Sequence, residues 1–184
     1  MKTTNVGRTL LITFLSGCYA ASARADAWMS RPAVPGALAA PDAAKLVAHF
    51  HATGAQIYAC VAAAGTATYS WTLKGPAATL FDQKGGAAGT HGAGPTWTAQ
   101  DGSSVVAKKV AQADAPSGDA IPWLLLRADK TSGTGIFAKV TYVQRIGTKN
   151  GKPPAASCDA ATSGTEKRSD YSAEYYFYSG GAAP

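Results

Sequence analysis

The sequence predicts an all-β protein: a single-domain β-sandwich or barrel of mainly antiparallel strands, preceded by a Pro- and Ala-rich N-terminal lead-in. Charged residues make up only 15% of the 184 residues, which is typical of exported β-rich proteins rather than helical cytosolic ones. About six to nine short segments show strand-like patterns, and Gly, Pro, Asn and Ser turns separate them. The length suits one domain with a sizeable core.

Residues 1–25 are predicted to be an export signal. Lys2 and Arg8 precede an apolar stretch, and residues 23–25 form a small-x-small cleavage site. The protein is therefore expected in the periplasm or outside the cell, beginning at Asp26. A competing site at residues 15–18 resembles a lipobox, and its use would leave a lipid-anchored chain beginning at Cys18. No later stretch approaches the roughly 20 apolar residues of a membrane helix, so no transmembrane segment is predicted.

The charge balance argues against a nucleic-acid partner. The formal net charge of +6 falls to about +3 without the predicted signal, which holds three basic residues and no acidic one. The remaining basic residues are scattered along the chain, with adjacent pairs only at 108–109 and 167–168. Phosphate binding requires a clustered basic surface, and this distribution does not indicate one.

Cysteine usage predicts one disulfide. Removal or lipidation of Cys18 leaves Cys60 and Cys158, which we expect to pair in an oxidising compartment. A thiol metal ligand or nucleophile is the alternative, but the sequence offers neither a CxxC motif nor a nearby histidine for it.

The lead-in is assigned to residues 26–42 and the β domain to residues 43–181. Residues 43–53 fit either a helix that Gly54 ends or a strand with alternating apolar residues, and we favour the strand. Gly54 would then be a bulge or tight bend before a second short strand. Further strands are expected at 68–73, 77–82 after a Gly75-Pro76 turn, 104–110, 121–127 as a strand buried on both faces, 136–146 and 171–178.

Residues 71–106 stand out because they combine two tryptophans, a histidine, two Gly-Pro steps and an Asp-Gly turn. The glycines at 89, 92 and 94 predict a loop with positive φ angles around His91, and Pro95 would fix its exit. This loop would hold His91 and Trp97 as a preformed, exposed pair. We interpret Trp71 and Trp123 as core residues and Trp97 as the tryptophan best placed to meet a ligand.

Non-catalytic binding is the function that these residues favour. Aromatic rings combined with amide and guanidinium groups are used by exported β domains to hold ligands. The partner would be a small ligand, a glycan or a protein, and no cofactor is expected. The candidate binding residues are His91, Trp97, Asp101, Gln56, Gln144 and Arg145.

The alternative is a metal-dependent or hydrolytic enzyme built on His91. On a strand, His49 and His51 project from one face, and with His91 they could supply three nitrogens to a transition metal. On a helix the first two would diverge by about 200°. Asp101 and either Ser103 or Ser104 lie near His91 in sequence, but no Gly-x-Ser-x-Gly elbow accompanies them. The sequence alone does not decide whether the protein is an enzyme.

Seven short motifs occur in order along the β domain. They are QIYxC at 56–60, a tryptophan at 71 followed by GPxAxL at 75–80, GxHxxGPTW at 89–97, DGS at 101–103, IPWLLL at 121–126, VTYVQR at 140–145 and YSAxYYFY at 171–178. Together they resemble a family of small exported bacterial and fungal proteins known only as a domain of unknown function. The resemblance covers roughly residues 45–178 and implies a fold unit and an exported location, without an activity. Some fungal relatives carry a malate dehydrogenase label, which this sequence does not support because it lacks a Gly-x-Gly-x-x-Gly fingerprint.

Overall fold

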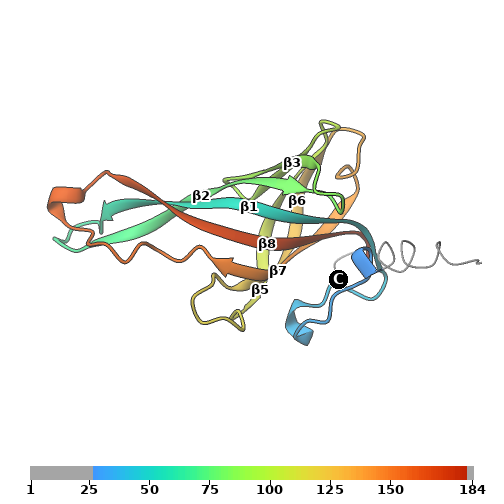
Figure 1. Cartoon of the computed structure of the whole chain (residues 1–184), viewed down its shortest axis with the longest axis horizontal. Helices are drawn as coiled ribbons and strands as arrows, with labels where there is room; N and C mark the ends of the chain where they lie inside the picture. The colour runs from blue at the N-terminus through green and yellow to red at the C-terminus, as the bar shows by residue number, and fades with distance from the viewer. Residues whose placement is uncertain (1–26, 182–184) are drawn as a thin grey trace, which may run out of the picture.

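The computed structural model describes residues 27–181 as a closed barrel of eight antiparallel strands in chain order, in which β1 pairs with β8 (Figure 1). The all-β prediction is confirmed, in its barrel form. The predicted export signal, both cleavage sites and Cys18 lie outside the described residues. The strands are β1 Ala44–Ala62, β2 Tyr69–Phe81, β3 Ala87–Gly92, β4 Thr96–Ala99, β5 Ser104–Ala113, β6 Trp123–Ser132, β7 Val140–Asn150 and β8 Glu166–Gly180, and two 3-10 turns are η1 Gly36–Leu38 and η2 Ala160–Thr162.

Strict alternation in β8 shows how the sequence builds the barrel. Tyr171, Ala173, Tyr175 and Phe177 all belong to the main core cluster and are at most 2% exposed, whereas Glu174 between them takes part in an outward-facing network. Side chains two residues apart on a strand share a face. The barrel is therefore closed around an aromatic interior, as the pattern at 171–178 predicts.

The first strand is longer than predicted. The strand assignment for residues 43–53 is confirmed, but β1 continues through Gly54 without a bend, and the register shift lies between Ile57 and Tyr58. Gly54 is required for another reason: a Cβ there would lie 2.2 Å from the carbonyl oxygen of Ala77 on β2. The glycine marks close approach of two strands rather than the end of one.

The predicted turn at Gly75-Pro76 is also wrong, because β2 runs through both residues. Gly75 has a φ of 150° and pairs with Ile57, directly beside the register shift of β1. A bulge of this kind accommodates a proline, which has no N–H to give to the sheet.

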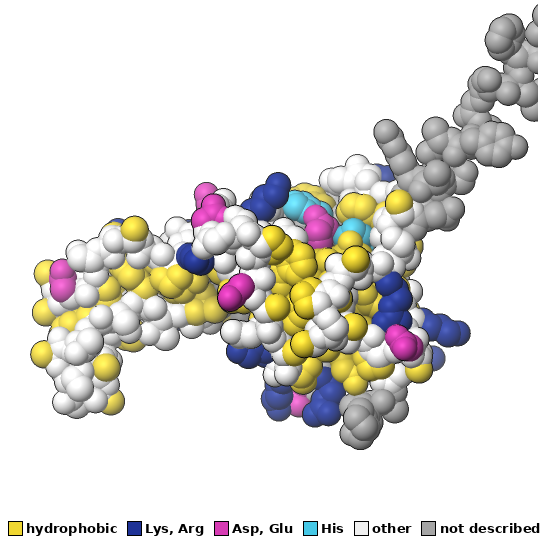
Figure 2. All heavy atoms as spheres, turned by 90° about the horizontal axis from the view of Figure 1, so that it is seen from below, with side chains coloured by type: hydrophobic (Ala, Val, Ile, Leu, Met, Phe, Trp, Pro, Cys, Tyr) yellow, Lys and Arg dark blue, Asp and Glu magenta, His cyan; other side chains and the backbone are white. Residues whose placement is uncertain are grey.

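Three long strands extend beyond the barrel as an arm. Figure 1 shows β1, β2 and β8 projecting to the left, with the segment before β8 lying alongside them. The predicted disulfide is confirmed: Cys60 in β1 and Cys158 in that segment are joined, with Cα atoms 5.5 Å apart. Figure 2 shows hydrophobic side chains along the arm, and Val61 and Leu73 are among the exposed large ones.

Residues before β1 pack against the outside of the barrel. Leu38 is fully buried in a second cluster with Tyr142 and Tyr178. Arg31 lies over the Tyr178 ring at 5.1 Å and donates to the carbonyl oxygen of Ala44 at 2.9 Å. This packing explains why 121–127 is apolar on both faces, since Leu126 of β6 faces the core whereas Leu125 faces the second cluster. Within residues 27–181, no helix has the length and apolar character needed to cross a membrane.

Candidate ligand-binding cavity

A cavity of about 240 Å³ opens at the end of the barrel next to the arm. Its apolar wall comes from leucines and prolines of several strands and of the segments between them: Leu73, Pro76, Pro95, Pro122, Leu124 and Leu126. Its polar lining comprises Gln56, His91, Trp97, Arg145 and Tyr175, together with Lys109 and Gln112. The cavity thus gathers Gln56, His91, Trp97 and Arg145, four of the six binding residues that the sequence indicates.

His91 and Trp97 are paired directly across the β3–β4 hairpin. Their rings stack with centroids 4.3 Å apart and planes 3° from parallel, as expected of a preformed pair. The expectation of an exposed loop is wrong, because both residues lie in strands and are 3% and 1% exposed. Of the three flanking glycines only Gly94, in the hairpin turn, has a positive φ. Gly89 instead allows close approach, since a Cβ there would lie 2.3 Å from the Thr98 carbonyl oxygen.

The His91 imidazole is neutral in this setting. Burial, the largest influence, lowers its pKa to about 3, and the charge of Arg145 acts in the same direction against a hydrogen bond to Thr96. His91 Nδ1 lies 2.9 Å from the Thr96 carbonyl oxygen, so Nδ1 carries the proton and donates it there. Nε2 is left as a hydrogen-bond acceptor on a ring that lines the cavity.

Two buried donors in the cavity lining have no partner among the described residues. They are Gln56 Nε2 on β1 and Trp97 Nε1 on β4, each on a side chain that is 1% exposed. An unsatisfied buried polar group costs about 1–3 kcal/mol, and native proteins keep few of them. Both donors belong to side chains that line the same cavity.

Arg145 brings a positive charge to the same cavity. Its Nε and Nη2 donate to the Pro122 carbonyl oxygen at 3.2 and 2.9 Å, and its charge acts on the neighbouring Tyr175 hydroxyl. Burial raises the pKa of the Tyr175 hydroxyl, and the Arg145 charge opposes this rise. No carboxylate within residues 27–181 forms an ion pair with Arg145.

The other two binding candidates lie elsewhere. Gln144 faces away from Arg145, into the second cluster, where it donates to the Leu38 carbonyl oxygen at 2.6 Å and accepts from the Tyr178 hydroxyl at 2.6 Å. Asp101 holds the turn between β4 and β5, accepting from the Ser103 backbone and hydroxyl at 2.9 and 2.6 Å. The side chains of Gln144 and Asp101 thus form hydrogen bonds within the fold and do not line the cavity.

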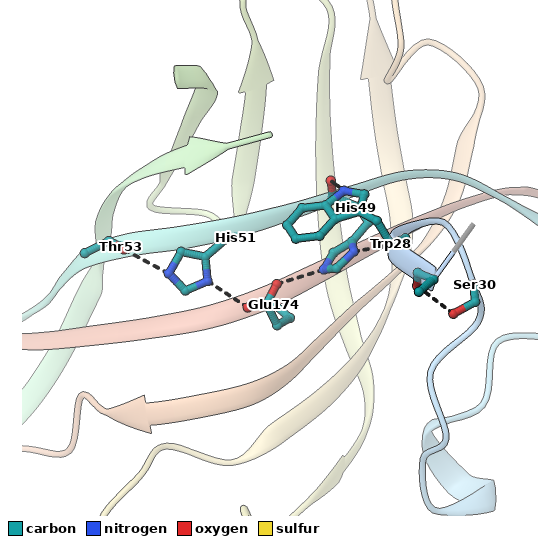
Figure 3. A network of polar contacts seen from close by, with 7 residues as sticks. Trp28, Ser30, His49, His51, Thr53 and Glu174 are labelled. Carbon is teal, nitrogen blue, oxygen red and sulfur yellow. Dashed lines mark hydrogen bonds and ion pairs between the residues drawn. The ribbon is translucent and has the colours of Figure 1, made fainter. Parts of the chain in front are cut away.

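The structure separates the three histidines. His49 and His51 alternate with buried Phe50 and therefore face outward, where both contact Glu174 at 2.7 Å (Figure 3). His91 faces the interior, against Trp97. The proposed three-nitrogen metal site is thus not assembled, and among the described residues no group of His, Cys, Asp and Glu side chains is placed to hold a metal ion.

His49 instead holds the segment before β1 against the outside of the barrel through its contacts with Trp28. Its ring is stacked between Trp28 and Tyr176, with centroid distances of 4.0 and 3.9 Å. Nδ1 lies 2.7 Å from the Trp28 carbonyl oxygen and Nε2 2.7 Å from Glu174, as Figure 3 shows. Each ring nitrogen therefore lies against an oxygen atom. Hydrogen bonds from His49 and His51, together with their charges, outweigh the effect of burial on Glu174, and its pKa lies below the ordinary value.

Sequence reasoning did not select Tyr175, Lys109 or Leu124 as site residues. The alternation of β8 was the available signal for Tyr175, since it places that ring inside the barrel. Lys109 and Leu124 come from β5 and β6, and only closure of the barrel brings these strands to the cavity.

Residues 41–179 match the family described as "Protein of unknown function (DUF3455)". Neither the curated proteins nor the solved structures contain a match.

Proposed function

The chain belongs to this uncharacterised family, and we propose that it is a non-catalytic binding domain that holds a small molecule in the barrel cavity around His91 and Trp97. Its disulfide suits an oxidising compartment, in keeping with the export that the N-terminal sequence predicts.

The unpartnered donors Gln56 Nε2 and Trp97 Nε1 carry this proposal. The two side chains that carry these donors belong to different strands and line one cavity whose remaining wall is largely apolar. Ligand sites combine these features: a mostly apolar hollow with a few directed polar groups. The volume of about 240 Å³ lies just below the roughly 300–1,000 Å³ of drug-sized pockets, so the ligand is small.

Binding is favoured over catalysis by what lines the cavity. Among the described residues that line it, there is no Ser, Cys, Asp or Glu. Neutral His91 therefore has no serine or cysteine nucleophile and no carboxylic acid to act with. Ser103 is committed elsewhere, donating to Asp101 and accepting from the backbone N–H of Phe137 at 3.0 Å.

A fragment screen followed by NMR of the indole N–H groups tests the proposal. Fragments that bind in the cavity should shift the Trp97 Nε1–H signal. The Trp71 Nε1–H signal is the internal control, because it donates to the Ala156 carbonyl oxygen on the arm at 2.8 Å and should not move. Filling the cavity with Leu124→Trp should abolish the shifts. A diverse screen in which no fragment moves the Trp97 signal would contradict the proposal.

A further inference from the structure

We propose that the ligand is an organic monoanion, a carboxylate carried on a small apolar body, and that Arg145 is its anchor. This inference rests on the proposed binding function and adds the chemical class of the ligand. It follows from charge, from the kind of hydrogen-bonding group left unpaired, and from the apolar wall.

The charge of the cavity is positive and uncompensated. Arg145 and Lys109 line it, whereas no Asp or Glu is among its described lining residues. A guanidinium stays protonated, and neutral His91 adds no charge. Arg145 is only partly buried but has no anionic partner among the described residues, so an anion entering this cavity gains a charge interaction that the fold leaves open.

A single negative charge fits better than two. Arg145 is the only guanidinium in the described lining. The other cation, Lys109, is on an exposed part of β5, and its Nζ donates to Gln112 Oε1 at 2.7 Å. The one partly buried positive charge balances a carboxylate, whereas a phosphate dianion would be left with excess charge in an apolar setting.

The cavity-lining side chains offer hydrogen-bond donors that have no acceptor among the described residues. A ligand rich in acceptor atoms would therefore suit them. Arg145 directs two nitrogens to Pro122 and one contact to Tyr175, and its remaining N–H groups have no described acceptor. Gln56 Nε2 and Trp97 Nε1 are also donors without partners. A carboxylate has acceptor sites only and matches the planar guanidinium fork. Hydroxyl-rich sugars would bring more donors than this cavity can accept.

The apolar wall of the cavity indicates that the part of the ligand beyond the carboxylate is apolar. Leu124, Leu126 and Pro122 line the cavity beside Arg145, and Pro95 lies near the His91–Trp97 pair. Leu73 of the arm also lines it and is 49% exposed, so the apolar body meets solvent on the arm side. His91 Nε2 can accept one donor, such as a hydroxyl or N–H, from this body.

Matched acid and amide pairs test the class of ligand. Isothermal titration and Trp97 indole NMR would compare benzoate with benzamide and octanoate with octanamide. Each carboxylate should bind at least about tenfold more tightly than its amide, because charge-assisted hydrogen bonds are the stronger ones. Arg145→Gln should remove that preference. Lys108→Gln, the matched control at an exposed cation outside the cavity lining that pairs with Asp129, should change the affinity less than about threefold.

The outcomes separate the two proposals. If amides bind as tightly as acids while shifting the Trp97 signal, the binding function stands and the anionic class is overturned. The assignment of the ligand as an organic anion is also overturned if the Trp97 signal shifts only with fragments that carry no carboxylate. It is overturned as well if Arg145→Gln still binds acids more tightly than amides. If no compound of any kind shifts it, the binding function itself fails. If Arg145→Gln does not fold, two other measurements decide between the same outcomes. They are the effect of Arg145→Lys and the ratio of the wild-type affinities for each acid and its amide.

Discussion

Burial of a neutral His91 should make the stability of the barrel depend on pH. The pKa of His91 is about 3 in the folded protein and about 6.5 in an unfolded chain. The unfolded chain therefore binds a proton below pH 6.5 that the folded protein does not bind until about pH 3. The contribution of neutral His91 to the free energy of unfolding is complete above pH 6.5. It declines by about 1.4 kcal/mol per pH unit as the pH falls.

The magnitude at pH 5 follows directly. One and a half units below the unfolded pKa, the His91 contribution should be reduced by about 2 kcal/mol. This pH lies above the range in which Asp and Glu side chains with lowered pKa values begin to cost stability, so the histidine effect can be measured separately. His91→Phe and His91→Asn cannot titrate and should both lack it, whatever their stability at pH 7.

Urea unfolding at pH 7 and pH 5, followed by far-UV circular dichroism, measures the difference. The wild-type protein should lose about 2 kcal/mol more than either variant between these values. Equal losses in wild-type and variant proteins would show that His91 takes up its proton in the folded state, and would refute the description of His91 as buried and neutral.

Three further predictions concern the frame around the cavity. Cys158→Ser opens the Cys60–Cys158 link across a sequence separation of 98 residues and should destabilise the protein by up to about 4–5 kcal/mol in chemical denaturation; an unchanged midpoint would argue against the disulfide. Glu174→Gln should cost about 1–3 kcal/mol at pH 7, because it weakens the bonds to His49 and His51. Since the pKa of Glu174 is lowered, this difference should shrink as the pH falls below about 4.5, and a constant difference would contradict the ion pair. Gly89→Ala should cost about 1–3 kcal/mol through contact with the Thr98 carbonyl oxygen, whereas a Cβ on Gly92 meets no atom within 4 Å, so Gly92→Ala should be nearly neutral in thermal unfolding.

Local pattern was enough to predict the class of fold. The alternation at 171–178 identified β8, and two cysteines in an exported chain identified the disulfide. Gly54 and Gly75 were misread because a glycine in sequence does not reveal whether it ends a strand or lets a neighbouring strand approach. The distinction depends on Ala77 and Ile57, which lie across the sheet.

The site was predictable in part, for a related reason. Gln144 and Arg145 are adjacent and were selected together, but neighbouring side chains on a strand point to opposite faces, and only the closed barrel shows that Arg145 faces the cavity. The sequence favours Trp97 over the other tryptophans as a residue outside the core, yet it is 1% exposed. The local sequence from His91 to Trp97 is typical of a loop. The two residues are buried because their strands pair with β2 and β5, and local sequence does not reveal this pairing.

A crystal structure of the protein soaked with benzoate would test the central claim most directly. We expect the carboxylate in the barrel cavity, with an oxygen within about 3 Å of an Arg145 nitrogen and hydrogen bonds from Gln56 Nε2 and Trp97 Nε1. If ordered waters alone satisfied these donors at a saturating benzoate concentration, the assignment of the cavity to an organic anion would be contradicted.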